Sequence, residues 1–220
     1  MLPSDEHGVE LVIDRSAATS LLNLPPEADG APLRDRPWWR DGWQYTAYRL
    51  GRPLESAAII GVGGGRVLYP PLAYGAKRVD GYELNGILVD FLERDLVEYN
   101  AIASRPEVTL IHDEARVGIT HSGRNYDVIQ ASLIDTWAAT ASGGFVLSEN
   151  GLYTREGWKV FLSHLSDHGV LTMSRWWLPN APAETERLVS LAAAGLADAG
   201  VPDARHHVIM TASPVRASGG

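Results

Sequence analysis

The sequence predicts a doubly wound α/β fold, in which a mostly parallel sheet is covered by helices on both faces. From Ala57 onward, short apolar segments typical of buried strands alternate with longer amphipathic segments typical of helices. The segment AAIIGVG is apolar and ends in glycines, as a central parallel strand does. With 220 residues, 45% of them hydrophobic and 21% charged, the chain has the size and composition of one folded domain.

The expected elements of this domain follow one another along the chain. Strands are expected at Ala58–Gly61, Val79–Leu84, Val108–His112, Tyr126–Ala131, Val170–Met173 and His207–Thr211, and helices at Asn85–Asn100, Thr154–Ser166 and Ala183–Ala199. The strands are apolar runs between turn residues, and the helix Asn85–Asn100 carries an apolar stripe with the helical period. A helix should also follow the first strand. Pro70 and Pro71 would cost it backbone hydrogen bonds, so we expect that helix to start late or to be short.

The N-terminal residues 1–56 are expected to form a small β and loop appendage to the main domain, residues 57–220. Val9–Ile13 is a short β-like run that would pair as a hairpin with the segment around Leu21–Leu24. After the sixth expected strand, no sequence remains for the seventh strand that is common in such sheets. The main domain is therefore predicted to be truncated at its C-terminus.

Composition and charge exclude several classes of protein. The 19 basic and 27 acidic residues give a formal net charge of −8, which argues against nucleic-acid binding dominated by phosphate contacts. The absence of cysteine excludes disulfides, a thiolate nucleophile and cysteine-ligated metals. His164 and His168 have the spacing of a metal-binding pair on a helix, but no third ligand accompanies them, so no metal is expected. No apolar run is long enough to span a bilayer and the first residues do not resemble a signal peptide, so a cytoplasmic location is expected.

A glycine-rich turn follows the first expected strand. Gly61, Gly63 and Gly65 form the pattern G-x-G-x-G, whereas a dinucleotide-binding turn would have a glycine in place of Arg66. Glycines let the backbone turn tightly and approach a ligand closely, and G-x-G-x-G is the form usual in proteins that bind S-adenosylmethionine. The other interpretation is a turn that is merely tight and binds nothing.

Two acidic residues follow the next two expected strands. Glu83 ends the second strand, where a carboxylate can accept hydrogen bonds from ribose hydroxyls, and Asp113 ends the third, where it can accept from an adenine amino group. Ligands of open α/β sheets bind at the carboxyl ends of the strands, so both residues should face the same site as the glycine turn. Asp113 has a second interpretation, because acidic residues at strand ends often cap the following helix.

These features occur within a wider resemblance over residues 57–177. The matching stretches are IIGVGGGRVL, AKRVDGYELN, VTLIHDEAR, YDVIQASLIDTW and LYTREGWKVF. In these stretches the sequence resembles the spermidine synthase-like (polyamine aminopropyltransferase-like) family, and most closely the bacterial spermidine synthase-like domains. The resemblance implies the Rossmann fold of S-adenosylmethionine-dependent methyltransferases. It also implies that Gly61, Gly63, Gly65 and Glu83 hold the methionine and ribose, that Asp113 contacts the adenine, and that residues 132–153 close over the substrate.

The resemblance has further implications for partners. Family enzymes are often dimers, so a homodimer is implied, and many bacterial relatives carry membrane-spanning helices before this domain. That arrangement would make the chain the cytoplasmic domain of a membrane protein.

The sequence departs from the family where the family performs its chemistry. The family motif D-x-x-D corresponds here to Ser132-Leu133-Ile134-Asp135, so serine replaces the first aspartate, which readies the attacking amine. An aspartate that contacts amino groups in the family's glycine turn corresponds to Gly64. Because an amine is protonated at pH 7 and needs a base, classical spermidine synthesis is disfavoured. Asp135 is the predicted catalytic substrate contact, and Ser132 is assigned to the donor-binding side.

Three functional hypotheses remain. In the first, the chain binds S-adenosylmethionine or its decarboxylated analogue and transfers a methyl or aminopropyl group to a small-molecule acceptor, such as an amine. In the second, it is a non-catalytic nucleoside-binding module of a larger membrane-associated protein. The third, an NAD-dependent oxidoreductase, is disfavoured by Arg66. Under the first, Glu83→Ala is expected to abolish nucleoside binding and leave the protein folded.

Overall fold

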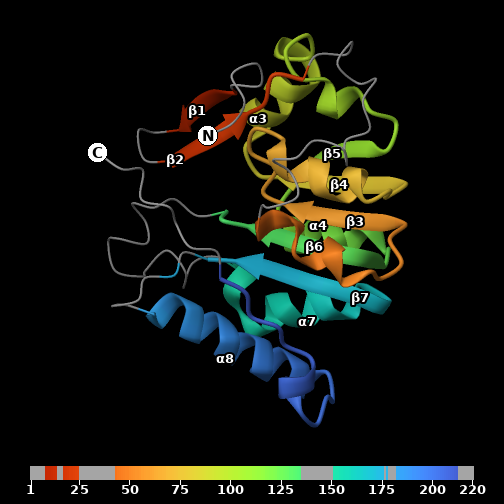
Figure 1. Cartoon of the computed structure of the whole chain (residues 1–220), viewed down its shortest axis with the longest axis vertical. Helices are drawn as coiled ribbons and strands as arrows, with labels where there is room; N and C mark the ends of the chain where they lie inside the picture. The colour runs from red at the N-terminus through yellow and green to blue at the C-terminus, as the bar shows by residue number, and fades with distance from the viewer. Residues whose placement is uncertain are drawn as a thin grey trace.

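A five-stranded parallel sheet forms the centre of the computed structural model, which describes residues 8–13, 17–24, 43–134, 151–175, 177 and 182–212. The strand order is β5-β4-β3-β6-β7, and β1 and β2 form a separate antiparallel hairpin. Figure 1 shows the strands stacked from β5 at the top to β7 at the bottom, with the hairpin at the upper left. The predicted doubly wound fold with a small N-terminal β appendage is therefore confirmed.

The elements alternate along the chain as expected for such a fold. The strands are β1 (Val9–Ile13), β2 (Ala17–Leu21), β3 (Ser56–Ile60), β4 (Arg78–Glu83), β5 (Val108–His112), β6 (Tyr126–Ser132) and β7 (Leu165–Ser174). The α-helices are α2 (Tyr69–Ala73), α3 (Gly86–Asp90), α4 (Ala115–Ser122), α7 (Arg155–Ser163) and α8 (Ala183–Asp198). Shorter turns are η3 (Trp43–Tyr45), η4 (Ala47–Leu50), η5 (Arg66–Leu68), η6 (Phe91–Asp95), η7 (Ala101–Ser104), η8 (Gly151–Tyr153) and η9 (Ala204–His206).

The central strand β3 is buried on both sides because helices cover each face of the sheet. Ala57 and Ile59 pack into an apolar cluster with residues of η4, α2, η6 and η7. Ala58 and Ile60 point the other way, into a cluster with residues of α4 and α7. Successive side chains of a strand alternate between the two faces, so a strand covered on both sides is apolar throughout.

The N-terminal hairpin is joined to the core of the sheet domain. It pairs Val9–Ile13 with Ala17–Leu21, so the expected hairpin forms, but its second strand begins four residues before Leu21. Leu21 and Leu22, at the end of the hairpin, are buried in the same cluster as β3. The side chain of Asn100 donates to the Leu22 carbonyl at 3.0 Å, which ties the hairpin to the segment before η7.

Several expected elements differ in the structure. The segment His207–Thr211 is not a strand. It follows the short turn η9, and in the described residues no strand pairs with the outer edge of β7. The helix expected at Asn85–Asn100 is α3 followed by the π-helical turn η6, which ends at Asp95. The helix expected at Thr154–Ser166 ends at Ser163, so His164 follows the helix and His168 lies in β7; the two do not share a helix face.

The helix after the glycine turn is short, as its prolines indicated. It is preceded by η5 and consists of α2 alone, with Pro70 in its first turn, where the missing N–H costs no helical hydrogen bond. In the described part of the chain, no helix is both long and apolar enough to cross a membrane.

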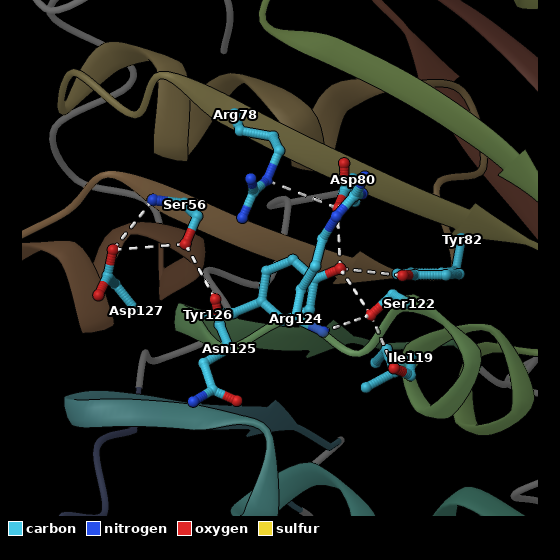
Figure 2. A network of polar contacts seen from close by, with 10 residues as sticks. All are labelled: Ser56, Arg78, Asp80, Tyr82, Ile119, Ser122, Arg124, Asn125, Tyr126 and Asp127. Carbon is cyan, nitrogen blue, oxygen red and sulfur yellow. Dashed lines mark hydrogen bonds and ion pairs between the residues drawn. The ribbon is translucent and has the colours of Figure 1, made fainter.

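Buried polar contacts join the strands near their amino ends (Figure 2). Asp80 of β4 is fully buried, and its Oδ2 accepts from the Tyr126 hydroxyl at 2.8 Å and from Arg124 Nη1 at 2.9 Å. The Tyr126 hydroxyl also lies 3.0 Å from that of Tyr82. Burial raises the pKa of Tyr126, so it stays a protonated donor to the carboxylate. These contacts connect β4 and β6 through the core.

A second carboxylate fastens the amino ends of β3, β6 and β7. Asp127 accepts from the amides of Glu55 and Ser56 at 2.8 and 3.0 Å, and from the Ser166 hydroxyl at 2.6 Å. Burial alone would raise the pKa of Asp127, but these hydrogen bonds outweigh it and hold the pKa below its usual value. Apart from Asp80 Oδ1, which is buried and has no hydrogen-bond partner among the described residues, the oxygens of these two carboxylates are hydrogen-bonded within the protein; the opposite edge carries the glycine turn.

Candidate functional site

The glycine turn directly follows β3, as predicted. Gly61, Gly63 and Gly65 have φ angles of 73°, 54° and 83°, a left-handed conformation that favours glycine. The Gly65 amide donates to the Val62 carbonyl at 3.0 Å and closes the turn before η5. The predicted pattern G-x-G-x-G therefore marks the positions where the backbone needs glycine.

Two neighbouring segments pack directly against this turn. A Cβ on Gly63 would lie 2.5 Å from Thr19 Oγ1, and a Cβ on Gly64 would lie 2.5 Å from the Ser20 carbonyl oxygen. The Gly64 amide donates to Thr19 Oγ1 at 2.8 Å. On the other side, a Cβ on Gly61 would overlap the side chain of Ile134, which follows β6. The hairpin β1–β2 therefore packs directly against the glycine turn.

Glu83 lies at the carboxyl end of β4 and contacts the glycine turn. Its Oε2 accepts from the Gly63 amide at 2.9 Å, and its Oε1 accepts from the Asn85 amide at 2.9 Å. The residue is 9% exposed. The Asn85 side chain in turn caps α3 by accepting from the Ile87 amide at 3.0 Å. The structure therefore brings two of the predicted site residues, Gly63 and Glu83, into direct contact.

Asp113 lies just beyond β5, beside the strand that ends in Glu83. Glu83 pairs with His112 in the register of β4 and β5, and Asp113 follows His112. Asp113 Oδ1 accepts from the Glu114 amide at 2.8 Å, but the N-cap of α4 is Glu114, which accepts from two amides of the first turn. Asp113 is therefore not the helix cap, and the interpretation as a mere cap is wrong.

Exposed apolar side chains flank these two carboxylates. Leu84, which follows Glu83, is 72% exposed, and Ile87 of α3 is 63% exposed. The backbone of Leu84 is held in place, since its carbonyl lies 3.2 Å from His112 Nε2. Large exposed apolar groups next to the buried carboxylate of Glu83 and the half-buried one of Asp113 suit a ligand that has both an apolar ring and polar groups.

Ser132 ends β6 and connects to a buried polar chain that the sequence did not reveal. Its Oγ accepts from Gln130 Nε2 at 2.7 Å, and Gln130 Oε1 accepts from the Tyr48 hydroxyl at 2.7 Å. Gln130 is 1% exposed and Tyr48 is 5% exposed. Burial raises the pKa of Tyr48 well above its usual range. The only local signal was a glutamine within the apolar part, VIQA, of a predicted strand.

The segment after Ser132 leads toward the predicted catalytic residue. Leu133 has a φ of 49°, a strained conformation for leucine, and costs of order 1 kcal/mol or more. Asp135, the predicted catalytic substrate contact, lies outside the described residues, as does most of the predicted closing loop. Arg175, just after β7, pairs with Glu184 at 2.8 Å, and its guanidinium lies 4.5 Å from the ring centre of Tyr153.

The site thus combines the carboxylates of Glu83 and Asp113, at the ends of β4 and β5, with the glycine turn after β3 and the Ser132 hydroxyl at the end of β6. Among the described residues, no group of three or more histidines, cysteines or acidic residues is placed to hold a metal ion. These site residues lie at the carboxyl ends of four neighbouring strands, in the order β5, β4, β3 and β6.

Comparisons with known proteins give the fold. No family model matches the sequence, and no curated protein sequence matches it. The spermidine synthase from Thermotoga maritima is similar with a TM-score of 0.54 at 14% identity, over 85% of this chain and 62% of that one. A spermidine synthase in complex with the transition-state analogue AdoDATO gives a TM-score of 0.52 at 13% identity, over 85% and 61%. The chain spans about three fifths of the length of these two structures. At these identities the similarity shows a shared fold, a Rossmann-like α/β fold built on a parallel sheet.

Proposed function

We propose that this chain binds S-adenosylmethionine, or a close adenosyl analogue, at the carboxyl end of its sheet and transfers a group from the sulfonium to a small-molecule acceptor. The observation that carries the proposal is the contact between Glu83 and the Gly63 amide at 2.9 Å. It places a carboxylate suited to ribose hydroxyls against the glycine turn, at the carboxyl end of the sheet where ligands of such folds bind.

The strand order supports a direction for the bound nucleoside. Along the sequence β5-β4-β3-β6, the site offers Asp113, then Glu83, then the glycine turn, then Ser132. The adenine would lie near Asp113 and against Leu84, where its amino group finds an acceptor and its ring an apolar surface. The ribose would lie at Glu83, and the sulfur-bearing tail would cross the glycine turn.

The chemical step asks little of the protein beyond alignment. An acceptor held in line with the carbon to be transferred forms a bond to that carbon while the carbon–sulfur bond breaks and the neutral thioether leaves. An amine acceptor attacks in its unprotonated form and then releases a proton to solvent. Ser132 does not act as a base, because its partner in the structure is the neutral amide of Gln130. Asp135 remains the proposed contact to the acceptor.

A second candidate function is favoured by Ser132, which stands where the family motif D-x-x-D has the aspartate that readies the attacking amine. If no acceptor is deprotonated at this site, the chain is a nucleoside-binding module without turnover. Methyl transfer, aminopropyl transfer and binding alone differ in what the protein does after the donor is bound, so donor binding is tested first.

The test is calorimetric titration of the purified chain with S-adenosylmethionine, decarboxylated S-adenosylmethionine, methylthioadenosine and NADH. We expect micromolar binding of at least one adenosyl sulfur compound and no binding of NADH. If none of the three sulfur compounds binds, the proposed function is wrong. Turnover with candidate acceptors then separates the transferase from the binding module.

A further inference from the structure

We propose that the chain Tyr48–Gln130–Ser132 fixes the Ser132 hydroxyl as a hydrogen-bond donor to the ligand's tail, and thereby selects an adenosyl compound with an α-carboxylate over its decarboxylated analogue. This inference rests on the proposed function and names the donor class of that same site. The three residues come from two distant segments, η4 and β6.

The direction of the hydrogen bonds follows from the first residue. Tyr48 is buried and its raised pKa keeps the phenol protonated, so the hydroxyl donates to Gln130 Oε1 at 2.7 Å. An amide whose oxygen faces Tyr48 must turn its NH2 group the other way. Gln130 Nε2 accordingly donates to Ser132 Oγ at 2.7 Å.

Ser132 is left with a proton to donate. A serine hydroxyl has one proton and two lone pairs, and here one lone pair is taken by Gln130. Among the described residues, none accepts a hydrogen bond from Ser132, whose side chain is partly exposed at the end of β6. The hydroxyl can therefore donate to a ligand, and a ligand that offers no acceptor gains no hydrogen bond from it.

The position of Ser132 matches the far end of the proposed ligand. Glu83 on β4 and Ser132 on β6 lie on either side of β3, which ends in the glycine turn. Neighbouring strands are about 4.8 Å apart, so the ends of β4 and β6 are about 10 Å apart. A nucleoside whose ribose is at Glu83 can extend its amino-acid tail over the glycines to Ser132.

The two donor compounds differ in what they present to that hydroxyl. The tail of S-adenosylmethionine ends in an ammonium and a carboxylate, whereas the decarboxylated compound ends in an ammonium alone. A carboxylate accepts hydrogen bonds and an ammonium only donates them. The Ser132 hydroxyl can therefore donate a hydrogen bond to the tail of the first compound but not to that of the second. Hydrogen bonds to charged groups contribute about 1.5–3 kcal/mol, which corresponds to a preference of about tenfold to a hundredfold.

The test uses three thioethers, which bind but cannot react. They are S-adenosylhomocysteine, its decarboxylated analogue and methylthioadenosine, which lacks the tail. We expect S-adenosylhomocysteine to bind at least about tenfold more tightly than the decarboxylated compound. Ser132→Ala should remove this preference, Ser132→Thr should retain it, and neither should change the affinity for methylthioadenosine.

Tyr48→Phe and a matched control show whether Tyr48 acts by orienting Ser132 or only by stabilising the protein. Tyr48→Phe removes the first donor of the hydrogen-bonded series Tyr48–Gln130–Ser132. It should reduce the preference for S-adenosylhomocysteine over its decarboxylated analogue, while methylthioadenosine still binds. Tyr69→Phe removes another buried tyrosine hydroxyl that donates to an amide oxygen, that of Asn100 at 2.9 Å, and should leave the preference unchanged.

The outcomes distinguish this inference from the proposed function. If methylthioadenosine binds but the decarboxylated compound binds as tightly as S-adenosylhomocysteine, the role of Ser132 is wrong and the nucleoside site stands. If Tyr48→Phe weakens all three ligands equally, the chain of hydrogen bonds is structural only. If no adenosyl compound binds the unaltered protein, both proposals fail together.

Discussion

Replacement of Glu83 should lower both ligand affinity and stability, because its carboxylate holds the backbone of the site. The sequence suggested that Glu83→Ala would leave the fold unaffected, but each oxygen of this buried carboxylate accepts from a backbone amide, one of Gly63 and one of Asn85. Hydrogen bonds to charged groups contribute about 1.5–3 kcal/mol each. Both contacts are partly buried, so the low end applies. We expect Glu83→Ala to lose about 3 kcal/mol of unfolding free energy and Glu83→Gln, which keeps one acceptor, about half of that.

Urea unfolding and calorimetric titration with S-adenosylhomocysteine measure the two effects separately. The matched control is Asp127→Ala, since Asp127 also accepts from two backbone amides, those of Glu55 and Ser56, but at the opposite edge of the sheet. The control should lose a comparable unfolding free energy and bind the ligand with unchanged affinity. Glu83→Gln, which is expected to lose less stability than Glu83→Ala, should bind S-adenosylhomocysteine at least about tenfold more weakly than the unaltered protein.

Two results would refute this reasoning. An unfolding free energy of Glu83→Ala within about 0.5 kcal/mol of the unaltered protein would mean that the carboxylate does not hold the turn, since even one net hydrogen bond contributes about that much. Equal losses of affinity in Glu83→Gln and Asp127→Ala would mean that ligand binding follows stability and not a contact with Glu83.

Three further predictions concern the surroundings of the site and the amino edge of the sheet. Thr19→Val should cost about 1 kcal/mol and speed hydrogen exchange of the Gly64 amide, measured by NMR, whereas Thr19→Ser should behave like the unaltered protein because it keeps the acceptor. Tyr126→Phe takes a hydrogen bond from the buried Asp80 carboxylate, so urea unfolding should show a loss of about 1.5–3 kcal/mol; a loss below about 0.5 kcal/mol would contradict it. Folding lowers the pKa of Asp127, so its contribution to stability is complete above the unfolded pKa of about 4 and is lost as the pH falls through the folded pKa. The urea concentration at the midpoint of unfolding should therefore fall below about pH 4, and it should fall less steeply in Asp127→Asn.

The strands of the sheet were predictable because their signal is local. The run Val108–His112 is β5 to the residue, and Tyr126–Ala131 lacks only the last residue of β6. Each is a short run rich in β-branched and other apolar residues between polar turns, a pattern typical of strands. The glycine turn and Glu83 were predictable for the same reason, since they lie directly at strand ends.

The errors arose where the outcome depends on distant partners. A run such as His207–Thr211 has the composition of a strand, but a strand needs a neighbour, and in the described residues none pairs there. The helix expected to reach Asn100 ends earlier, and Asn100 is buried, with its side chain donating to Leu22. The residues around the site were missed similarly: Tyr48 and Gln130 are 82 residues apart, and Thr19 and Gly64 are 45 apart.

The glycines themselves are the weakest guide to what the site binds, although they are its most visible feature in the sequence. A Cβ on Gly63 would overlap Thr19, a Cβ on Gly61 would overlap Ile134, and both have left-handed backbone conformations. Each is required by the protein's own packing, whether or not a ligand is present. An alanine there would disturb the hairpin or the segment after β6, so a loss of binding would not identify a ligand contact. Glu83 and Ser132 are better probes, because a conservative variant of each changes a single hydrogen-bonding group, and the stability loss of Glu83→Gln can be measured separately and matched by Asp127→Ala.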